Sequence, residues 1–356
     1  MTNIYDRSAY DYELPDELIA TKPANPRQES RLMFVQNGAI RHKKFSDLAQ
    51  ILRANDLVVI NNVAVQRARF FAVRATGGRV EVLLTQDAAT AHRRLTCLWK
   101  ARARLRVDEI LFAEKDQGVR LRLSREKEAA YVEFLGEEPV VDILTRIGEL
   151  ALPPYIVKRR QSLGEVLYNA QDEEDYQTVY ASDGAAIAAP TAGLHFSVSQ
   201  IRELQEAGIK FSPLRLDVGP GTFQPIRSDD LNEHRMHSES YEIPEELVRD
   251  FAACKNAGGR VIAVGTTVVR SLEDQAQRYG ELRAGVYDTD IFIKPGHRFT
   301  MLDAMITNFH LPASTLMVLI SAFAGYELVR EAYAKAIAER YRFYSYGDAM
   351  LLFKGA

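Results

Sequence analysis

The sequence predicts an α/β fold, a mostly parallel sheet covered by helices and interrupted by an inserted small β-barrel domain. Three observations lead to this prediction. Apolar strand-like runs alternate with amphipathic stretches near both ends of the chain, which is typical of sheets covered on both faces. In between, short runs alternate apolar and polar residues without long helices, as in a barrel. We therefore expect a discontinuous α/β domain of residues 1–66 and 151–356 and a barrel domain of residues 67–150.

Each part contributes recognisable elements. The run at residues 56–62 is apolar between polar ends, which fits a strand buried on both faces. Period-two alternation predicts barrel strands at Gly78–Leu84, Leu95–Arg106 and Gly118–Leu123. Consecutive prolines at residues 153 and 154 predict a stiff linker back into the sheet. Beyond the linker we expect strands at Ala185–Ala189, Phe211–Val218, Arg260–Val264 and Asp303–Thr307, and helices at Val198–Ala207, Pro244–Ala257, Thr267–Tyr279 and Ser314–Ala324.

Composition narrows the class of protein. The 356 residues are 47% hydrophobic and 26% charged, the balance of a globular protein with a full core. A net charge of -3 gives no overall sign of polyanion binding, so any nucleic-acid surface must be local. Cys97 and Cys254 are too few and too far apart for a disulfide framework, which favours a reducing, cytoplasmic setting. The N-terminus lacks the pattern of a signal peptide, and the apolar run Leu316–Ala324 is too short to cross a membrane.

Polar residues follow several expected strands at their carboxyl ends, where open α/β sheets bind ligands. Gly265, Thr266 and Thr267 join a buried strand to a helix, and such a turn presents free N–H groups and hydroxyls to a nucleotide or a carboxylate. An ordinary threonine N-cap explains the same residues. Asn308 and His310 end another apolar strand, either as ligand contacts or as turn residues. Ser314 then caps the buried helix that follows.

A second turn runs from Ala188 to Ser197. Small residues here precede His195, and Ser197 and Gln200 have the spacing of a capping box before a helix. A histidine in this place is a candidate titratable group, although histidines more often serve a structural role. The small residues around it favour function.

Two further motifs suggest sites that the sequence does not complete. His234 and His237 could lie on one face of a helix, but no third ligand follows at a standard spacing, so we predict no metal. Glu233, His234 and His237 are then either candidates for general acid/base catalysis or part of a polar surface loop. The turn at residues 217–222 resembles the glycine loop of AdoMet-dependent methyltransferases, yet Phe223 and Pro225 disfavour a helix directly after Gly221.

A stripe of positive charge marks the expected barrel. Lys100, Arg102, Arg104 and Arg106 recur at every second residue, which on a strand places all four charges on one face. Such a stripe can follow a phosphate backbone, and a solvated barrel face is the plainer alternative. Lys158, Arg159 and Arg160 would extend the patch if they lie nearby.

Taken together and in order, the motifs resemble one family, the S-adenosylmethionine:tRNA ribosyltransferase-isomerases of queuosine biosynthesis. The resemblance covers nearly the whole chain and also includes Asp11–Pro15, Ser30–Leu32 and Leu152–Ile156. It departs at Asp217, where relatives often carry histidine, so no essential imidazole is expected there. The motifs that carry it are Tyr176–Ala181, Ala188–Phe196, Gly219–Phe223, Ala263–Thr267, Ile306–Pro312 and Tyr346–Leu351.

The resemblance implies an activity and its partners. The family transfers the ribosyl group of S-adenosylmethionine (AdoMet) to 7-aminomethyl-7-deazaguanine at the wobble position of tRNA and isomerises it, giving epoxyqueuosine and releasing adenine and methionine. It also implies an α/β domain interrupted by a barrel, a monomer, and no metal or cofactor beyond AdoMet as co-substrate. A methyltransferase acting on RNA and a non-catalytic RNA-binding protein remain as alternatives.

The matched motifs imply candidate site residues. His195 and His310 are the first proton-transfer candidates, followed by His234, His237 and Glu233. Arg270 is available for the methionine carboxylate, and Asn308 for orienting the substrate. AdoMet contacts are expected from Thr191, Gly193, Gly265, Thr266 and Thr267. Independently of these motifs, the basic residues described above are the candidates for RNA contact: Lys100, Arg102, Arg104, Arg106, Lys158 and Arg159.

Overall fold

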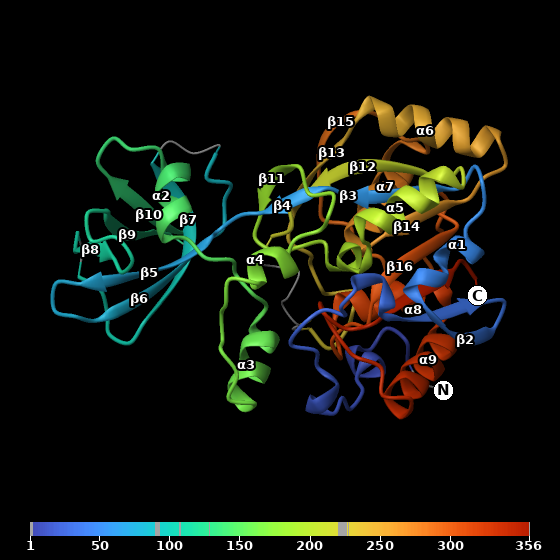
Figure 1. Ribbon diagram of the computed structural model, residues 1–356, viewed down its shortest axis with the longest axis horizontal. Helices are drawn as coiled ribbons and strands as arrows, with labels where there is room; N and C mark the ends of the chain where they lie inside the picture. Colours follow the sequence, from blue (N-terminus) through green and yellow to red (C-terminus); the bar gives the residue numbers. More distant parts are fainter. Residues whose placement is uncertain are drawn as a thin grey trace. The chain divides into compact units, whose positions relative to one another are not determined.

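The computed structural model describes residues 3–89, 93–106, 108–127, 129–219, 226 and 228–355 (Figure 1). The chain divides into two compact units, each of which combines separate stretches of sequence. The sheet unit contains residues 1–62, 153–181 and 190–356, and the barrel unit contains residues 63–152 and 182–189.

Among the described residues, nine strands form the sheet of the sheet unit, in the order β15-β13-β12-β3-β14-β16-β17-β1-β2. Parallel pairings join β12, β3, β14 and β16 in the centre and β17 with β1, and the other neighbours are antiparallel. Strands from both ends of the chain therefore share one sheet. Their bounds are β1 Arg31–Gln36, β2 Ala39–Lys44, β3 Leu57–Asn61, β12 Lys210–Leu216, β13 Glu239–Ile243, β14 Val261–Val264, β15 Gly285–Thr289, β16 Ala304–Asn308 and β17 Ala349–Phe353.

The central strands are covered on both faces. Every residue of β3, β14, β16 and β17 is buried, as expected for strands between two layers of helix. The helices of this unit are α1 Leu48–Ile51, α3 Pro154–Ser162, α4 Asp172–Asp175, α5 Val198–Glu206, α6 Glu245–Asn256, α7 Thr266–Tyr279, α8 Thr315–Ala324 and α9 Tyr326–Ala338. Short 3-10 helices lie at Arg7–Tyr10, Asp16–Leu18, Arg27–Glu29, Phe45–Asp47 and, as η5, Thr191–His195.

Local sequence signals explain where several helices begin and end. The Ser197 side chain accepts a hydrogen bond from the backbone N–H of Gln200 and caps α5, and Ser314 caps α8 in the same way. Helix α7 ends at Gly280, which has the left-handed conformation that favours glycine. Both serine caps were predicted from the sequence and are confirmed.

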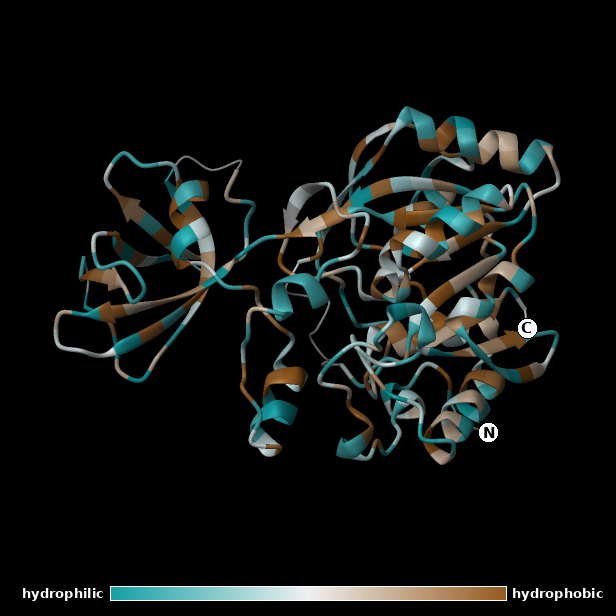
Figure 2. Ribbon diagram, viewed as in Figure 1, coloured by the Kyte–Doolittle hydropathy of each residue, from teal (hydrophilic) through white to brown (hydrophobic). Residues whose placement is uncertain are grey.

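Among the described residues of the barrel unit, six antiparallel strands close in the order β10-β7-β6-β5-β8-β9. Buried residues alternate with more exposed ones along strands such as β6 and β10, and Figure 2 shows the corresponding alternation of brown and teal. Helix α2, Val140–Ile147, packs against the same apolar core. The strands are β5 Arg69–Arg74, β6 Arg79–Leu84, β7 Arg94–Ala101, β8 Ile110–Ala113, β9 Arg120–Glu126 and β10 Ala129–Leu135, and a separate parallel pair joins β4 Val63–Val65 to β11 Asp183–Ala186.

The predicted fold class, an α/β sheet with helices and an inserted barrel, is confirmed. Two local predictions were wrong. The strand expected at Leu95–Arg106 ends at Ala101, the last residue for which β6 supplies a partner. The strand expected in the sheet at Ala185–Ala189 is β11, Asp183–Ala186, which pairs with β4 outside the nine-stranded sheet. Pro153 and Pro154 lie where the chain returns to the sheet unit, and Pro154 opens helix α3, because proline is well tolerated in the first turn, where its missing N–H is not needed.

No helix in the described part of the chain is long and apolar enough to span a membrane.

Candidate active site

The turn after β14 meets the 3-10 helix η5 in the sheet unit. Gly265 has a φ of 92°, a conformation that favours glycine. A Cβ on Gly265 would lie 3.7 Å from the Cβ of Ala192, so η5 packs directly on this turn. The Gly265 N–H donates to the carbonyl of Ile306 in β16 (2.8 Å). The ends of β14 and β16 are therefore held together beneath η5.

Asn308, the last residue of β16, is held by hydrogen bonds on both sides of its amide. The Thr191 hydroxyl donates to Oδ1 over 3.2 Å. Nδ2 lies 3.1 Å from Nε2 of His195 and donates to the carbonyl of Tyr344, also over 3.1 Å. Because an amide nitrogen only donates, Nε2 of His195 is the acceptor. Asn308 thus joins η5, the end of β16 and the segment before β17.

His195 is buried and uses both ring nitrogens. With Nε2 accepting from Asn308, Nδ1 carries the proton and donates to the hydroxyl of Ser30, 2.9 Å away. The ring packs on Phe45 with a centroid distance of 5.1 Å. Burial, with smaller effects from Arg342 and Arg27, lowers the pKa of His195 to about 3. The imidazole is therefore neutral at neutral pH and fixes the position of Asn308.

His310 lies two residues beyond Asn308 and is also buried. Its Nε2 is 2.8 Å from the hydroxyl of Thr307, and its backbone N–H donates to the Tyr333 hydroxyl (2.8 Å). Burial lowers the pKa of His310 to about 3. Within the described residues Nδ1 of His310 has no hydrogen-bond partner, so this ring, unlike that of His195, keeps one nitrogen available.

Three buried hydroxyls around η5 lack a hydrogen-bond partner among the described residues: those of Thr178, Tyr180 and Thr267. A Cβ on Gly193 would lie 2.0 Å from the Tyr180 hydroxyl and 2.9 Å from Cγ2 of Thr178. A Cβ on Gly265 would lie 3.6 Å from Oγ1 of Thr267. Buried polar groups without a partner are costly, and their gathering in one place indicates a site for a polar ligand.

Comparison with known proteins assigns this arrangement to a family. A family model described as queuosine biosynthesis protein matches residues 7–352. A relative from Azoarcus sp. (strain BH72) is 46% identical over 96% of both chains, and one from Pelobacter propionicus is 45% identical over 96% of this chain and 98% of its own. Both are named S-adenosylmethionine:tRNA ribosyltransferase-isomerase. The chain belongs to the queuosine biosynthesis family.

A solved structure supports the same conclusion at the level of the fold. The crystal structure of S-adenosylmethionine tRNA ribosyltransferase from Thermotoga maritima is 32% identical to this chain, with a TM-score of 0.54. The match covers 97% of this chain and 99% of that one. Both the sheet and the barrel therefore lie within the part of the chain shared with this relative.

The sequence predicts that Arg270 binds the methionine carboxylate, but this side chain already forms an ion pair within the protein. Its Nη1 forms a short ion pair with Oε2 of Glu239, and Nε donates to the carbonyl of Ile291 over 3.3 Å. The other oxygen of Glu239 accepts from the backbone N–H of Gly219 (3.2 Å). In the described part of the chain only Nη2 of this buried guanidinium lacks a partner. One donor of Arg270 thus remains for a ligand.

Glu233, His234 and His237 lie in an irregular segment, so the expected helical face for two imidazoles is absent. His234 is half-buried against the edge of Phe292, with ring centroids 5.2 Å apart. Burial, and to a smaller extent His237, lowers its pKa. No hydrogen bond or ion pair among the described residues joins these three side chains to Asn308 or His195. The described part of the chain also contains no group of three or more potential metal ligands.

The structure describes only residues 217–219 of the methyltransferase-like turn. Asp217 forms an ion pair with Arg215 through two bonds of 3.0 Å. The prediction that no helix follows Gly221 concerns residues 220–225, which lie outside the described residues. Cys97 and Cys254 are buried and free, with no disulfide between them.

The predicted RNA-binding cations have separate local settings. Lys100 is on β7, but Arg102, Arg104 and Arg106 follow its end, so the prediction that one strand face carries all four was wrong. All four side chains are exposed, and no ion pair within the described residues involves them. Most other barrel arginines are paired with glutamate or aspartate.

In the sheet unit, α3 carries the other predicted cations. Lys158 is exposed and Arg159 is half-buried. Arg160 is buried and forms an ion pair with Asp172 at 2.6 Å, so the prediction that it extends a surface patch was wrong.

Sequence reasoning missed Thr178 and Tyr180 as site residues. Both belong to the motif at residues 176–181 that supported the family resemblance, but nothing in its spacing shows that they face η5. Ser30 and Tyr344 were missed for the same reason, because their contacts with His195 and Asn308 join residues far apart in sequence.

Proposed function

We propose that this chain transfers the ribosyl group of AdoMet to 7-aminomethyl-7-deazaguanine at the wobble position of tRNA and isomerises it. The products are epoxyqueuosine-tRNA, adenine and methionine. The observation that carries this proposal is the 45–46% identity, over at least 96% of this chain, to relatives named for this activity. The tRNA substrate implies a cytoplasmic enzyme, and we propose that it acts as a monomer.

AdoMet binds at the strand ends beneath η5 in this proposal. Gly265, Thr266 and Thr267 lie at the start of α7, where free N–H groups favour a negatively charged group. The unpaired hydroxyls of Thr178, Tyr180 and Thr267 supply hydrogen bonds to the bound ligand. The other side of the proposed AdoMet site is formed by Thr191, Gly193 and Asn308. Nη2 of Arg270 is the donor proposed for the methionine carboxylate.

The chemistry requires a base for a C5′ proton and a donor for the departing adenine. The sulfonium of AdoMet itself acidifies the C5′ protons, so the proposal needs neither a metal nor a redox cofactor. His310 is the proposed base because its Nδ1 is unpaired among the described residues, although burial lowers its pKa and so weakens it as a base. Burial raises the pKa of Tyr180, so its hydroxyl stays protonated and can donate to adenine. His195 orients Asn308. His234, His237 and Glu233 are weaker candidates for proton transfer than His310 and Tyr180.

The tRNA contact of this proposal lies on exposed cations. Lys100, Arg102, Arg104 and Arg106 in the barrel unit are exposed and lack an ion pair among the described residues, which leaves their charge available for phosphates. Lys158 and Arg159 contribute from α3. The chain has a net charge of -3, so binding depends on such local groups.

The test is to incubate the protein with AdoMet and tRNA that carries 7-aminomethyl-7-deazaguanine. We expect adenine and methionine in equal amounts and a matching mass increase on the tRNA, measured by mass spectrometry. Release of S-adenosylhomocysteine would instead identify a methyltransferase, and binding without any small product would identify an RNA-binding protein. Unmodified tRNA with guanine at the wobble position is the control and should give no adenine.

A further inference from the structure

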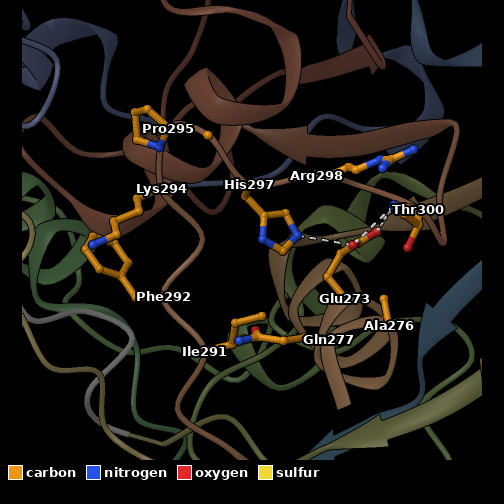
Figure 3. Close-up of a pocket in the computed structure, with 11 residues that line it drawn as sticks. Glu273, Ala276, Gln277, Ile291, Phe292, Lys294, Pro295, His297, Arg298 and Thr300 are labelled. Atoms are coloured by element: carbon orange, nitrogen blue, oxygen red, sulfur yellow. Dashed lines mark hydrogen bonds and ion pairs between the residues drawn. The ribbon is translucent and has the colours of Figure 1, made fainter. Parts of the chain in front are cut away.

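A cavity of about 510 Å³ lies between α7 and the segment that leads into β16 (Figure 3). His297 lines this cavity, with Nε2 3.1 Å from a carboxylate oxygen of the buried Glu273. Figure 3 shows Lys294 and Arg298 on opposite sides of the His297 ring, so their charges do not converge on one ligand. In the barrel unit, by contrast, an unpaired cation lies directly over an aromatic ring.

The two ends of the barrel are closed in different ways. Helix α2 covers the end where β5 and β7 begin. The Thr145 carbonyl in α2 accepts a hydrogen bond from Arg67, just before β5 (2.7 Å), and the Glu138 carbonyl, just before α2, accepts one from Arg93, just before β7 (2.8 Å). Trp99 is the third residue from the other end of β7. It is half-buried and packs against the barrel core, so its side chain helps to cover the end away from α2.

Arginine side chains lie over three aromatic rings in the described part of the barrel unit. The pairs are Arg69 and Arg79 on Phe71, Arg94 on Tyr131, and Arg125 on Trp99. Carboxylates hold the first three arginines: Glu81 pairs with Arg69, Glu114 with Arg79 and Glu126 with Arg94. Arg125 is exposed, lies 5.1 Å from the centroid of the Trp99 ring, and forms no ion pair among the described residues. The charge over Trp99 is therefore the one left without a carboxylate partner in that part of the chain.

More positive charge follows Trp99 along the chain. Arg102 and Arg104 are exposed, and no ion pair among the described residues involves either side chain. Arg102 is three residues from Trp99, and three residues of extended chain span at most about 11 Å. The surroundings of the Trp99 ring are therefore rich in positive charge, which favours a negatively charged partner such as RNA.

We propose that Trp99 and Arg125 form a stacking site for an unpaired base of the tRNA substrate. The identity of this RNA rests on the proposed function. Every nucleobase has a flat π surface that stacks on aromatic side chains and on guanidinium planes, whatever its sequence. The guanidinium of Arg125 also donates charge-assisted hydrogen bonds to an adjoining phosphate. This site binds tRNA by stacking, in addition to the charge of the exposed cations.

The first experiment uses the fluorescence of Trp99, which is the single tryptophan of the chain and therefore reports on this site alone. The protein is titrated with tRNA, and the emission is corrected for absorbance by the RNA. We expect the emission to fall as tRNA binds, because a base stacked on the indole quenches it. An RNA duplex of similar charge, whose bases are paired, is the control and should quench much less. Absence of quenching by tRNA, or equal quenching by the duplex, overturns the proposal.

The second experiment measures tRNA affinity against salt concentration. Trp99→Leu keeps an apolar side chain on the barrel core but removes the aromatic face. We expect its affinity for tRNA to fall at least about fivefold, with the slope of log K against log salt unchanged, because no charge is lost. Trp99→Phe restores an aromatic ring and should recover part of the affinity. An affinity of Trp99→Leu within about twofold of the wild type overturns the proposal.

A matched variant elsewhere in the barrel controls for general effects of losing an aromatic side chain. Tyr131→Leu removes a half-buried ring whose arginine, Arg94, is paired with Glu126. It should bind tRNA as the wild type does, and a loss equal to that of Trp99→Leu would contradict a specific site at Trp99. Thermal unfolding verifies that each variant is folded, and the fluorescence titration of the wild type needs no variant.

Adenine release, measured in the same wild-type samples, separates this inference from the proposed function. Quenching by tRNA without adenine release would contradict the proposed function and leave the stacking site in place. Adenine release without quenching would contradict the stacking site alone.

Discussion

The sheet unit buries polar and charged side chains, whereas the barrel keeps nearly all of them outside. The sheet unit contains the buried pairs Arg160–Asp172 and Arg270–Glu239, in addition to His195 and Asn308. The barrel core is an apolar cluster, and pairs such as Arg79–Glu114 lie on its surface. Buried polar groups cannot shift without losing partners, so they suit a site that needs fixed geometry. Exposed cations suit contacts with a flexible, charged partner.

The strongest test of this contrast removes one buried and one exposed ion pair. Arg160 is 1% exposed and its partner Asp172 is 6% exposed, so Arg160→Ala leaves an uncompensated buried carboxylate. We expect the free energy of unfolding to fall by about 3–5 kcal/mol. Arg79→Ala breaks a solvated pair and should cost at most about 1 kcal/mol. Denaturant unfolding measures both, and similar losses would contradict the contrast.

Acid should destabilise the sheet unit through its buried histidines. His195 and His310 have pKa values lowered to about 3 in the folded state, from 6.5. The unfolded chain then binds more protons below 6.5, so this stability is present above that pH and is lost as the pH falls toward 3. Between pH 7.5 and 5.5 the two groups together predict a loss of about 3 kcal/mol.

Hydrogen exchange followed by mass spectrometry can locate this loss. Peptides from β14 and β16 should lose protection as the pH falls, after correction for the intrinsic exchange rate. Peptides from β5 and β6 should not, because no histidine lies in the described part of the barrel unit. Equal loss in both sets of peptides would contradict the assignment to these histidines.

The variant His195→Ala should slow adenine release by about 100-fold, equivalent to about 2.7 kcal/mol, because Asn308 loses its bond to Nε2. A positioning role predicts a fall in kcat with tRNA affinity within about threefold of the wild type. His195→Gln, which can still accept from Asn308, should recover part of the rate. Normal turnover in His195→Ala would remove this residue from the mechanism.

Gly193→Ala tests how tightly η5 is packed. The new Cβ would lie 2.0 Å from the hydroxyl of Tyr180, and we expect a loss of about 1–3 kcal/mol from overpacking. Adding Tyr180→Phe removes that oxygen and should recover part of the stability, while Cζ, at 2.9 Å, limits the recovery. A double variant no more stable than the single one would show that this contact is not the cause. Thermal unfolding measures both variants.

The smallest expected effect is that of two barrel cations on tRNA binding. Arg102→Glu/Arg104→Glu should weaken binding by about tenfold and lower the salt slope by up to about 2. The control Arg330→Glu/Lys335→Glu reverses two charges on α9 and should leave the slope unchanged. An unchanged slope in the barrel variant would assign Arg102 and Arg104 to a solvated face.

Local patterns predicted most of the fold because they arise from nearest neighbours along the chain. The apolar run at residues 56–62 contains β3, and the serine caps of α5 and α8 lie where the sequence places them. The alternation at residues 100–106 led to a wrong prediction of strand, because alternation alone cannot supply a strand partner. Strand β7 ends at Ala101, where its pairing with β6 ends. The prediction that the strand near residue 185 belongs to the main sheet was wrong for a similar reason, because β11 pairs with β4 and not with a strand of that sheet.

The sequence by itself determined the family, the two kinds of architecture and the turns on which Asn308, His195 and Gly265 lie. Tertiary structure decided what those side chains do. Only folding brings Ser30 and Asn308 to opposite nitrogens of His195, joins Arg270 to Glu239, and sets Glu273 beside His297. The physical reason is that a hydrogen bond acts over about 3 Å, whereas its partners here lie tens to hundreds of residues apart, so their pairing depends on how the strands and helices pack.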